Sequence, residues 1–457
     1  MRLLIVRALP LFFLVLLSTN GFAKKINLLP SYKCTTIQSN ILQPDAVQTA
    51  FAYRDDLRSY DYTKKRSKID ERKALAKYLP QVSVNVNKAY TVPYILQNPE
   101  TYEIIRCPEH TSEEGIAFHL QQPIFTGGKP LAEYRIAKEG TKIVQYDRQT
   151  AANSIQLSVE TAFLETQKLF WKNKFIATKD ATAKKVFEQS DCYKKVGFLN
   201  ETEWQSAITT YAFDRTDVVN HEREKINALS KLQREIGVPV CPEDLNLSLQ
   251  NIEHIELAPL EYYLGQALKN RPELKKQKHS ARQARWQEKR FALSYIPDVN
   301  VYARAQTSKL REFSLYNTSS WEAGLEVNWS FDGLSSAHTS QQYKNLEVEI
   351  KLQKKDLELK IEKDVKITYE QIKISQNGLK SLMLALKQQE TNLKLKESQY
   401  CTGLISEAEL AQAKLSYEET VFDLTSTKID INAAYQNLLF LCGYPKEKND
   451  AFAKVIS

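Results

Sequence analysis

The sequence has little of what most enzymes and metal proteins use. Its six cysteines form no C-x-x-C pair and its six histidines are scattered along the chain. His221-Glu222 has no second histidine at the spacing of a zinc-protease helix. The motif TGGK at residues 126–129 lacks the spacing of a phosphate-binding loop. These absences predict a protein with no catalytic residues, no metal site and no cofactor.

Long apolar runs are also missing beyond the first residues. Residues 1–23 combine two arginines, an apolar run at 8–18 and small residues at 21–23, which is typical of a secretory signal peptide. An N-terminal anchor helix is the alternative. No later run approaches the roughly 18 apolar residues that a membrane helix needs. We therefore expect an exported chain that is soluble or enters a membrane by a route other than helices.

The charge balance is only mildly basic. Lys and Arg number 63 against 55 Asp and Glu, and removing residues 1–23 takes away two arginines, which leaves 61 − 55 = +6. Lys and Glu alternate in runs such as KLQKKDLELKIEKDVK at 351–366, a pattern of solvated helical faces. This predicts no nucleic-acid partner. An exported chain permits disulfides, but the pairing of six cysteines cannot be deduced from sequence, and lone buried thiols remain the alternative.

Proline is absent from residue 298 to residue 444, and motifs in this half of the chain have counterparts in the other half. Three motifs recur after 206 residues, and one upstream of them recurs after 217 residues. The pairs are FTGG 125–128 with FDGL 331–334, VGFL 196–199 with TGLI 402–405, GVP 237–239 with GYP 443–445, and LP 79–80 with IP 296–297. We therefore expect two repeats of one plan, residues 24–239 and 240–445, followed by a short tail at 446–457.

Each repeat is expected to be mainly α-helical, with a strand section near its start. The expected first-repeat elements are a helical stretch at 44–78, strands within about 81–125, a long helix at 131–196 and a last helix at 200–236. Their second-repeat counterparts are 260–295, about 298–331, 336–402 and 406–442. The long helix would measure about 100 Å, close to the two shorter helices laid end to end. Its apolar residues recur every three or four positions, which predicts coiled-coil packing between antiparallel neighbours.

The strand section alternates apolar and polar residues. In SSWEAGLEVNWSF at 319–331, Trp321 and Trp329 lie on one face, about 27 Å apart at 3.3 Å per residue. This is close to the roughly 25 Å apolar band of an outer-membrane barrel, which has aromatic residues at both edges. A soluble sheet with one buried face is the alternative. Four strands per chain are too few for a membrane barrel, so several chains would have to share one.

The order of these elements resembles the TolC-type outer-membrane efflux proteins. The motifs that carry the resemblance are YLPQ 78–81, YIPD 295–298, QPIFTGG 122–128, VGF 196–198 and the segments 232–239 and 438–445. The resemblance implies a homotrimer in the outer membrane of a Gram-negative bacterium, with a shared 12-stranded barrel in the lipid and an α-helical barrel in the periplasm. It also implies a passive exit duct for efflux or type I secretion, which docks a periplasmic adaptor protein and an inner-membrane transporter.

The resemblance also implies roles for residues at the two helical turns. The adaptor-docking turns would be Val196, Gly197 and Phe198, and Thr402, Gly403 and Leu404. The second turn departs from the family because Thr402 replaces a small apolar residue. Cys192 and Cys401 lie near the two turns, so a cross-link between neighbouring coils is a further hypothesis.

The same resemblance places a pore constriction just past the second turn. Glu409 would supply the first acidic position, whereas Gln412 stands where the family has a second acid. A lock between coils would join Tyr400 to Glu203, and Ile405 replaces a basic residue that can also hold it. A less charged, more weakly latched gate is therefore expected. Three Glu409 carboxylates around a threefold axis would favour cations, but Glu409 as an ordinary solvated acid is the alternative.

A secreted trimeric coiled-coil rod, with no membrane barrel, is the alternative function for the whole chain. The helices alone do not distinguish it from a channel, because both need long amphipathic helices. The strand section favours the channel. The exported substrate, the pump and the adaptor are not predicted by the sequence.

Overall fold

The computed structural model describes residues 42–91, 95–97, 101, 104–106, 111–240, 245, 255–312 and 314–444. The signal peptide and the tail expected from the sequence lie outside this range. All helices and strands described below belong to one compact unit, Leu42–Val238 with Leu247–Ser457. The fold is mainly α-helical with a four-stranded antiparallel sheet, which confirms the expected fold class.

The helices follow the predicted order in both repeats. The first repeat has α2 (Gln43–Tyr53), α3 (Asp55–Ala76), α4 (Lys129–Lys195) and α5 (Glu201–Ile236). The second has α6 (Leu260–Asn270), α7 (Pro272–Ala292), the short 3-10 helix η2 (Leu293–Tyr295), α8 (Ser335–Cys401) and α9 (Glu407–Leu441). The long helices α4 and α8 each contain 67 residues, so each spans about 100 Å.

The structure divides each expected first helix in two. The breaks fall at Arg54, with φ −70° and ψ 120°, and at Arg271, with φ −56° and ψ 123°. Arg271 precedes Pro272, whose ring disfavours the helical conformation at the residue before it. No proline follows Arg54; there the guanidinium binds the Glu235 carboxylate at 2.8 Å instead. The pattern of apolar residues continued across both breaks, so it did not predict them.

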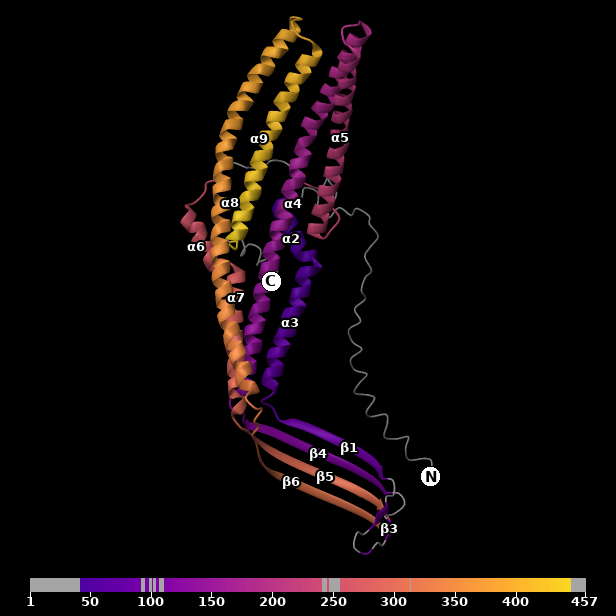
Figure 1. Ribbon diagram of the computed structural model, residues 1–457, viewed down its shortest axis with the longest axis vertical. Coiled ribbons are helices and arrows are strands. Elements are labelled where there is room, and N and C mark those ends of the chain that lie inside the picture. The colour runs from indigo at the N-terminus through magenta and orange to yellow at the C-terminus, as the bar shows by residue number, and fades with distance from the viewer. Residues whose placement is uncertain are drawn as a thin grey trace. The chain divides into compact units, whose positions relative to one another are not determined.

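The shorter helices pack along the long ones, as expected from their lengths. Helices α2, α3 and α5 lie along α4, while α6, α7 and α9 lie along α8 (Figure 1). Contacts of α4 with α7 and with α9 join the two repeats. A buried core runs through the second repeat and includes Tyr263, Ile361, Val365, Ile372 and Leu438. The repeats therefore form one continuous helical bundle.

The four-stranded sheet has the order β1-β4-β5-β6. Its strands are β1 (Gln81–Thr91), β4 (Thr111–Phe125), β5 (Asp298–Glu312) and β6 (Ser314–Asn328), and all neighbours are antiparallel. Between β1 and β4 lies a separate pair, β2 (Ile95–Gln97) and β3 (Ile104–Arg106). Within this sheet, β1 and β6 each pair along one side only, so two strand edges are open in the single chain.

One face of the sheet is apolar and exposed. The register aligns alternate residues of the four strands on this face: Val82, Val84, Val86, Ile116, Phe118, Leu120, Val299, Val301, Trp321, Leu325 and Val327. Trp321 is 83% exposed and Leu325 is 69% exposed. Trp329 lies one residue beyond β6, and its indole donates to the Tyr295 carbonyl at 3.1 Å. The predicted alternation is therefore present, but only one of the two tryptophans is in the strand.

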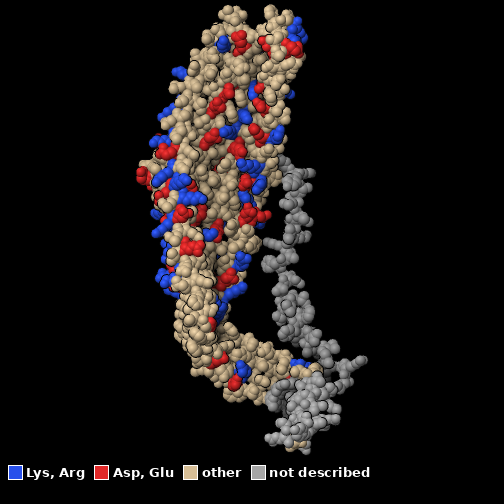
Figure 2. Space-filling view, in the orientation of Figure 1, with Lys and Arg blue, Asp and Glu red and all other residues tan. Residues whose placement is uncertain are grey.

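The opposite face of the sheet is polar. The Arg304 guanidinium donates to the Glu322 carboxylate at 3.0 Å, and the Tyr302 ring lies near the His119 ring. On the side shown in Figure 2, charged residues are dense over the helices and sparse over the sheet. In the described part of the chain, no helix combines the length and apolar character needed to cross a membrane.

Candidate functional site

The two helical turns have the same backbone geometry. Gly197 and Gly403 follow the long helices with φ of 80° and 72°, a left-handed conformation that favours glycine. The amide of Phe198 donates to the Tyr193 carbonyl at 2.8 Å, and the amide of Leu404 donates to the Gln399 carbonyl at 2.9 Å. Both turns are thus helix ends of the Schellman type, as the glycines predicted.

The turns expose large apolar side chains. Phe198 is 81% exposed and Leu404 is 76% exposed, and Val196 is also exposed. A Cβ atom at Gly197 or Gly403 would have no atom of another described residue within 4 Å, apart from the adjoining residues. The turns are therefore open on their outer side. Exposed apolar residues at a loop that holds its shape are typical of a contact surface.

Polar caps begin the helices that follow each turn. The Asn200 side chain accepts from the Glu203 amide at 2.8 Å, and the Glu203 carboxylate accepts from the Asn200 amide at 3.0 Å. Ser406 caps α9 by accepting from the Glu409 amide at 3.2 Å. These caps satisfy backbone donors that a helix start leaves free. Glu203 therefore has a structural role in its own helix.

An ion pair spans the first turn. Lys194, at the end of α4, binds Glu201, at the start of α5, and lies 5.7 Å from the Trp204 ring centre. The hydrogen bond from Lys194 holds the pKa of the Glu201 carboxyl below its usual range. The second turn has no charge at the positions of Lys194 and Lys195, because Tyr400 and Cys401 stand there. The two turns share a backbone but differ in charge.

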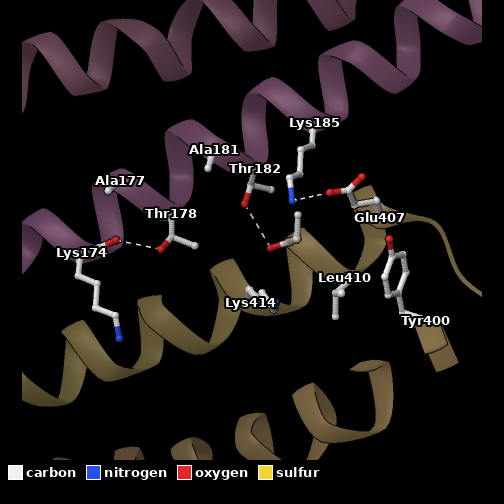
Figure 3. A pocket seen from close by; sticks show the side chains of 11 residues that line it. Lys174, Ala177, Thr178, Ala181, Thr182, Lys185, Tyr400, Glu407, Leu410 and Lys414 are labelled. Carbon is white, nitrogen blue, oxygen red and sulfur yellow. Dashed lines mark hydrogen bonds and ion pairs between the residues drawn. The ribbon is translucent and has the colours of Figure 1, made fainter. Parts of the chain in front are cut away.

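A pocket of about 480 Å³ lies between α4 and α9 beside the second turn (Figure 3). Tyr400 lines it together with Glu407, and the Lys185 ammonium lies 2.7 Å from the Glu407 carboxylate. The Thr182 hydroxyl donates to the Ala411 carbonyl at 3.2 Å. Tyr400 therefore lies in an inter-repeat contact whose acid is Glu407.

A second cavity of about 310 Å³ lies between α4, α5 and α9. Glu203 and Gln412 both line this cavity. Thr182 lines both this cavity and the first pocket. Within the described residues, the carboxylate of Glu203 contacts its own helix cap rather than Tyr400. The structure thus brings Glu203 together with Gln412, and Tyr400 together with Glu407. The lock expected between Tyr400 and Glu203 stays a prediction.

Glu409 faces away from the first pocket. It is exposed, and its position differs from that of Glu407 by two residues, which is a rotation of about 160° around the helix. Its carboxylate forms no hydrogen bond or ion pair with other described residues. Glu409 is therefore available to a surface outside the single chain, as a pore-lining acid must be. Its role at a constriction is untested.

Ion pairs continue the contact between α4 and α9 away from the turn. Lys174 binds Glu418 at 2.8 Å, and Lys168 binds Asp430 at 2.8 Å. Hydrogen bonding to Glu418 raises the pKa of Lys174. In these pairs, as in Lys185–Glu407, the lysine is on α4 and the acid on α9. Small residues lie between them: Ala177, Thr178, Ala181, Thr182 and Ala411.

Sequence reasoning missed this row of ion pairs. Lys185 and Glu407 are 222 positions apart, and no motif links them. The usable signal was the 206-residue offset, which brings the two turns to the same end of the bundle. The offset indicates which residues lie at the same end of the bundle. It does not indicate how each helix is rotated about its own axis, and this rotation decides which side chains meet.

The cysteines near the turns are free thiols. Cys192 and Cys401 are exposed and Cys442 is buried, and none of these three is in a disulfide. Cys34, Cys107 and Cys241 lie outside the described residues. A cross-link between Cys192 and Cys401 of neighbouring chains remains a hypothesis.

Comparison with known proteins identifies the second repeat. Residues 263–444 match the family model described as Outer membrane efflux protein. This part of the chain is therefore similar to the outer membrane efflux proteins. No curated protein matches the chain. The first repeat shares the plan of the second, which extends the same architecture over the described chain.

Solved outer-membrane channels have the same fold. The CmeC channel of Campylobacter jejuni is similar with a TM-score of 0.74 and 13% identity, over 93% of this chain and 97% of that one. The MtrE channel of Neisseria gonorrhoeae gives 0.68 and 13%, over 92% and 96%. VceC of Vibrio cholerae gives 0.66 and 15%, over 88% and 97%.

These matches confirm the resemblance that the sequence predicted. The solved neighbours are outer-membrane channels rather than enzymes. The chain therefore has the fold of these solved outer-membrane channels, and its residues 263–444 match the outer membrane efflux protein family model.

Proposed function

We propose that the protein is a homotrimeric channel in the outer membrane of a Gram-negative bacterium. It serves as the passive exit duct of a tripartite efflux or type I secretion system, and it docks a periplasmic adaptor and an inner-membrane transporter. The observation that carries the proposal is a four-stranded sheet with two open edges and an exposed apolar face, in a fold shared with outer-membrane channels.

The open edges of the sheet require a partner. Strands β1 and β6 carry unpaired backbone groups, and an apolar face beside them makes aggregation or pairing unavoidable. In lipid an unpaired edge is not tolerated. Pairing β6 of one chain with β1 of the next closes a barrel with four strands per chain. Three chains supply twelve strands, which exceeds the minimum of about eight for a membrane barrel.

Two helices carry exposed apolar side chains that are available for the same association. Phe213, Val219 and Ile226 are exposed on α5, and Ile374, Leu384 and Leu395 are exposed on α8. Ile226 and Ile374 each lie about 40 Å from their turns at 1.5 Å per residue. These side chains therefore lie at similar distances from the turns, and α5 of one chain packs against α8 of the next.

A soluble rod is disfavoured by the sheet. Its apolar face would leave Trp321, Leu325 and Val327 in water, each more than half exposed. A rod in water would leave this apolar face unburied, although burial of apolar surface is the main favourable contribution to the free energy of assembly. The open edges would also remain unpaired in a rod that associates through helices alone.

The turns support docking of an adaptor at the end remote from the sheet. Phe198 and Leu404 are exposed apolar residues held by a repeated backbone geometry. Phe198→Asp and Leu404→Asp are expected to reduce recovery of the adaptor after mild cross-linking by about tenfold. Tyr62→Asp is the matched control, since Tyr62 is exposed to 68% on α3. Equal recovery with all three variants would contradict docking at the turns.

The channel itself is tested by oligomeric state and conductance. In mild detergent, native mass spectrometry is expected to give three copies, and planar bilayers are expected to give steps of current. Washing membranes with urea separates the two alternatives, because a rod is released and a barrel is retained. A monomer in detergent, or a bilayer without current, would overturn the proposal.

A further inference from the structure

A large pocket lies on the second repeat, well away from the turns. It has a volume of about 910 Å³ and is bounded by α8, α9 and the segment before α6. The Gln376 amide donates to the Ile255 carbonyl at 2.8 Å, which ties this segment across α8. The volume is within the range of small-molecule sites, roughly 300–1,000 Å³.

One wall of the pocket is apolar. Leu257, Tyr369, Leu379, Met383 and Ile431 line it. Leu257, Tyr369 and Leu379 also pack against the buried core of the second repeat, so the wall is part of a fixed surface. Met383 is nearly half exposed, which leaves apolar surface open to solvent at the mouth.

The rim of the pocket is cationic. Lys373 and Lys380 stand two helical turns apart on α8, and Lys428 on α9 lines the same pocket. Glu256 is the only acid in the lining. None of the three lysines forms an ion pair within the part of the chain that the structure describes, whereas many other lysines on the long helices do. The three lysines therefore give the rim a net positive charge that a bound anion would neutralise.

We propose that this pocket binds an anionic amphiphile, a molecule with one carboxylate, sulfate or sulfonate head and a compact apolar body. The head lies between Lys373, Lys380 and Lys428, and the body lies on Leu379 and Met383. Concave walls of low polarity strengthen the attraction of the lysines for the head. The site lies away from the turns, on the stretch of α8 that also carries Ile374 and Leu384, so binding is tested both in the assembled protein and in the single chain.

Two other occupants fit less well. A free inorganic anion would use the lysines but not the apolar wall, which would then stay wet. An acidic helix of a partner protein would need an open groove along α8, and the segment fixed by Gln376 and Ile255 closes one end of the pocket. A compact amphiphile uses both the charge and the wall.

Two fluorescent probes with one aromatic frame test the proposal. 1-Anilinonaphthalene-8-sulfonate carries the anionic head, and N-phenyl-1-naphthylamine lacks it. The full-length protein is titrated in nanodiscs of zwitterionic lipid, with empty nanodiscs as the background. A chain that does not enter nanodiscs is titrated in buffer, so failure of the membrane proposal leaves this test intact.

Lysine variants test whether the charged rim binds the sulfonate. Lys373→Gln with Lys380→Gln is expected to weaken binding of the sulfonate about tenfold and to change binding of the neutral probe less than twofold. Lys355→Gln with Lys360→Gln is the control, because both lysines are exposed on α8 outside the pocket. Met383→Ser is expected to weaken binding of both probes.

Four outcomes would overturn the inference. The first is an unchanged sulfonate affinity in Lys373→Gln with Lys380→Gln. The second is an equal loss in the control variant, which would indicate attraction to the general charge of α8. The third is displacement of the sulfonate by inorganic phosphate as effectively as by dodecanoate, which would indicate a simple anion site. An added acidic peptide that competes at lower concentration than dodecanoate would likewise replace the amphiphile with a protein partner.

Discussion

The Lys185 ammonium on α4 lies 2.7 Å from the Glu407 carboxylate on α9, and this ion pair joins the two repeats beside the second turn. The pair is partly exposed, with side-chain exposures of 43% and 60%, so its contribution to stability is about 0–1 kcal/mol. A contact this weak can hold two coils together and still open at small cost. It is therefore a better candidate for a latch than for a structural support.

Glu407→Gln is expected to favour separation of α9 from α4 at the turns. The charge attraction to Lys185 is lost, while the amide keeps the size of the side chain. Single-channel recordings in planar bilayers are expected to give a higher open conductance or more frequent opening. Glu188→Gln is the control, because the Lys184–Glu188 pair is confined to α4. An equal effect of both variants would contradict a latch between the repeats.

Glu409→Ala tests the acid on the other side of α9. Because Glu409 points away from Lys185 and has no partner among the described residues, its removal is expected to leave the Lys185–Glu407 pair intact. The expected result is a higher conductance or weaker block by multivalent cations. Identical currents with and without such cations would exclude Glu409 from the pore constriction and leave it a solvated acid.

The contrast between Glu407 and Glu409 shows what sequence could and could not predict. Gly197 and Gly403 predicted the turns because only a left-handed residue ends a helix in that way. Alternation at Trp321 to Val327 predicted one face of the sheet. The partner of Glu407 depends on how α9 is rotated against α4. That rotation is set by packing of residues far apart in the chain, so the sequence pointed to Glu409 and did not identify Glu407.

The break at Arg271 was also within reach of the sequence. Pro272 follows it directly and disfavours helix at the preceding residue. The break at Arg54 was not, because it coincides with a contact to Glu235, 181 positions away. Local chemistry therefore predicted the turns and could have predicted one break, whereas the other break coincides with a contact between helices.

The buried pair of Glu139 and His279 predicts a dependence of stability on pH. Their side chains meet at 2.5 Å between α4 and α7, and the Tyr146 ring stacks on His279. Burial alone would raise the pKa of Glu139, but the hydrogen bond to His279 and the charge of Lys142 outweigh it and lower the pKa. The folded state therefore binds fewer protons at Glu139 than the unfolded state does.

The direction of the pH dependence follows from this difference in the number of protons bound at Glu139. The stabilisation by Glu139 is fully present above its ordinary pKa of 4.5 and is lost as the pH falls through the lower folded pKa. Glu139→Gln is expected to cost about 1–3 kcal/mol at pH 7 and less at pH 3. Thermal unfolding of both proteins from pH 7 to pH 3 measures this. A difference that stays constant over the range would contradict a lowered pKa of Glu139.

The thiols are expected to differ in reactivity. Burial raises the pKa of Cys442 to about 12, and its thiol lies against the Tyr263 carbonyl. Cys192 and Cys401 are exposed. Because the thiolate is the reactive form, maleimide at pH 8 is expected to modify Cys192 and Cys401 at least tenfold faster than Cys442. Peptide mapping by mass spectrometry measures each rate, and rapid modification of Cys442 in folded protein would contradict its burial.

Tyr444→Phe tests the contact that closes the end of the second repeat. The Tyr444 hydroxyl donates to the Glu160 carboxylate at 3.0 Å, and Tyr444 is 1% exposed. The Gln156 amide donates to the other carboxylate oxygen at 3.0 Å. Phenylalanine keeps the ring but removes one hydrogen bond from a buried charge, so a loss of about 1–3 kcal/mol is expected.

The measurement is the midpoint of denaturant unfolding at one protein concentration. Glu160→Gln combined with Tyr444→Phe is expected to cost less than the sum of the single changes, because a neutral amide tolerates the missing hydroxyl better than a carboxylate does. Tyr435→Phe, on a partly buried tyrosine of α9, is expected to cost less than about 0.5 kcal/mol. Strictly additive losses at Tyr444 and Glu160 would mean that the hydroxyl and the carboxylate act independently, despite the 3.0 Å between them.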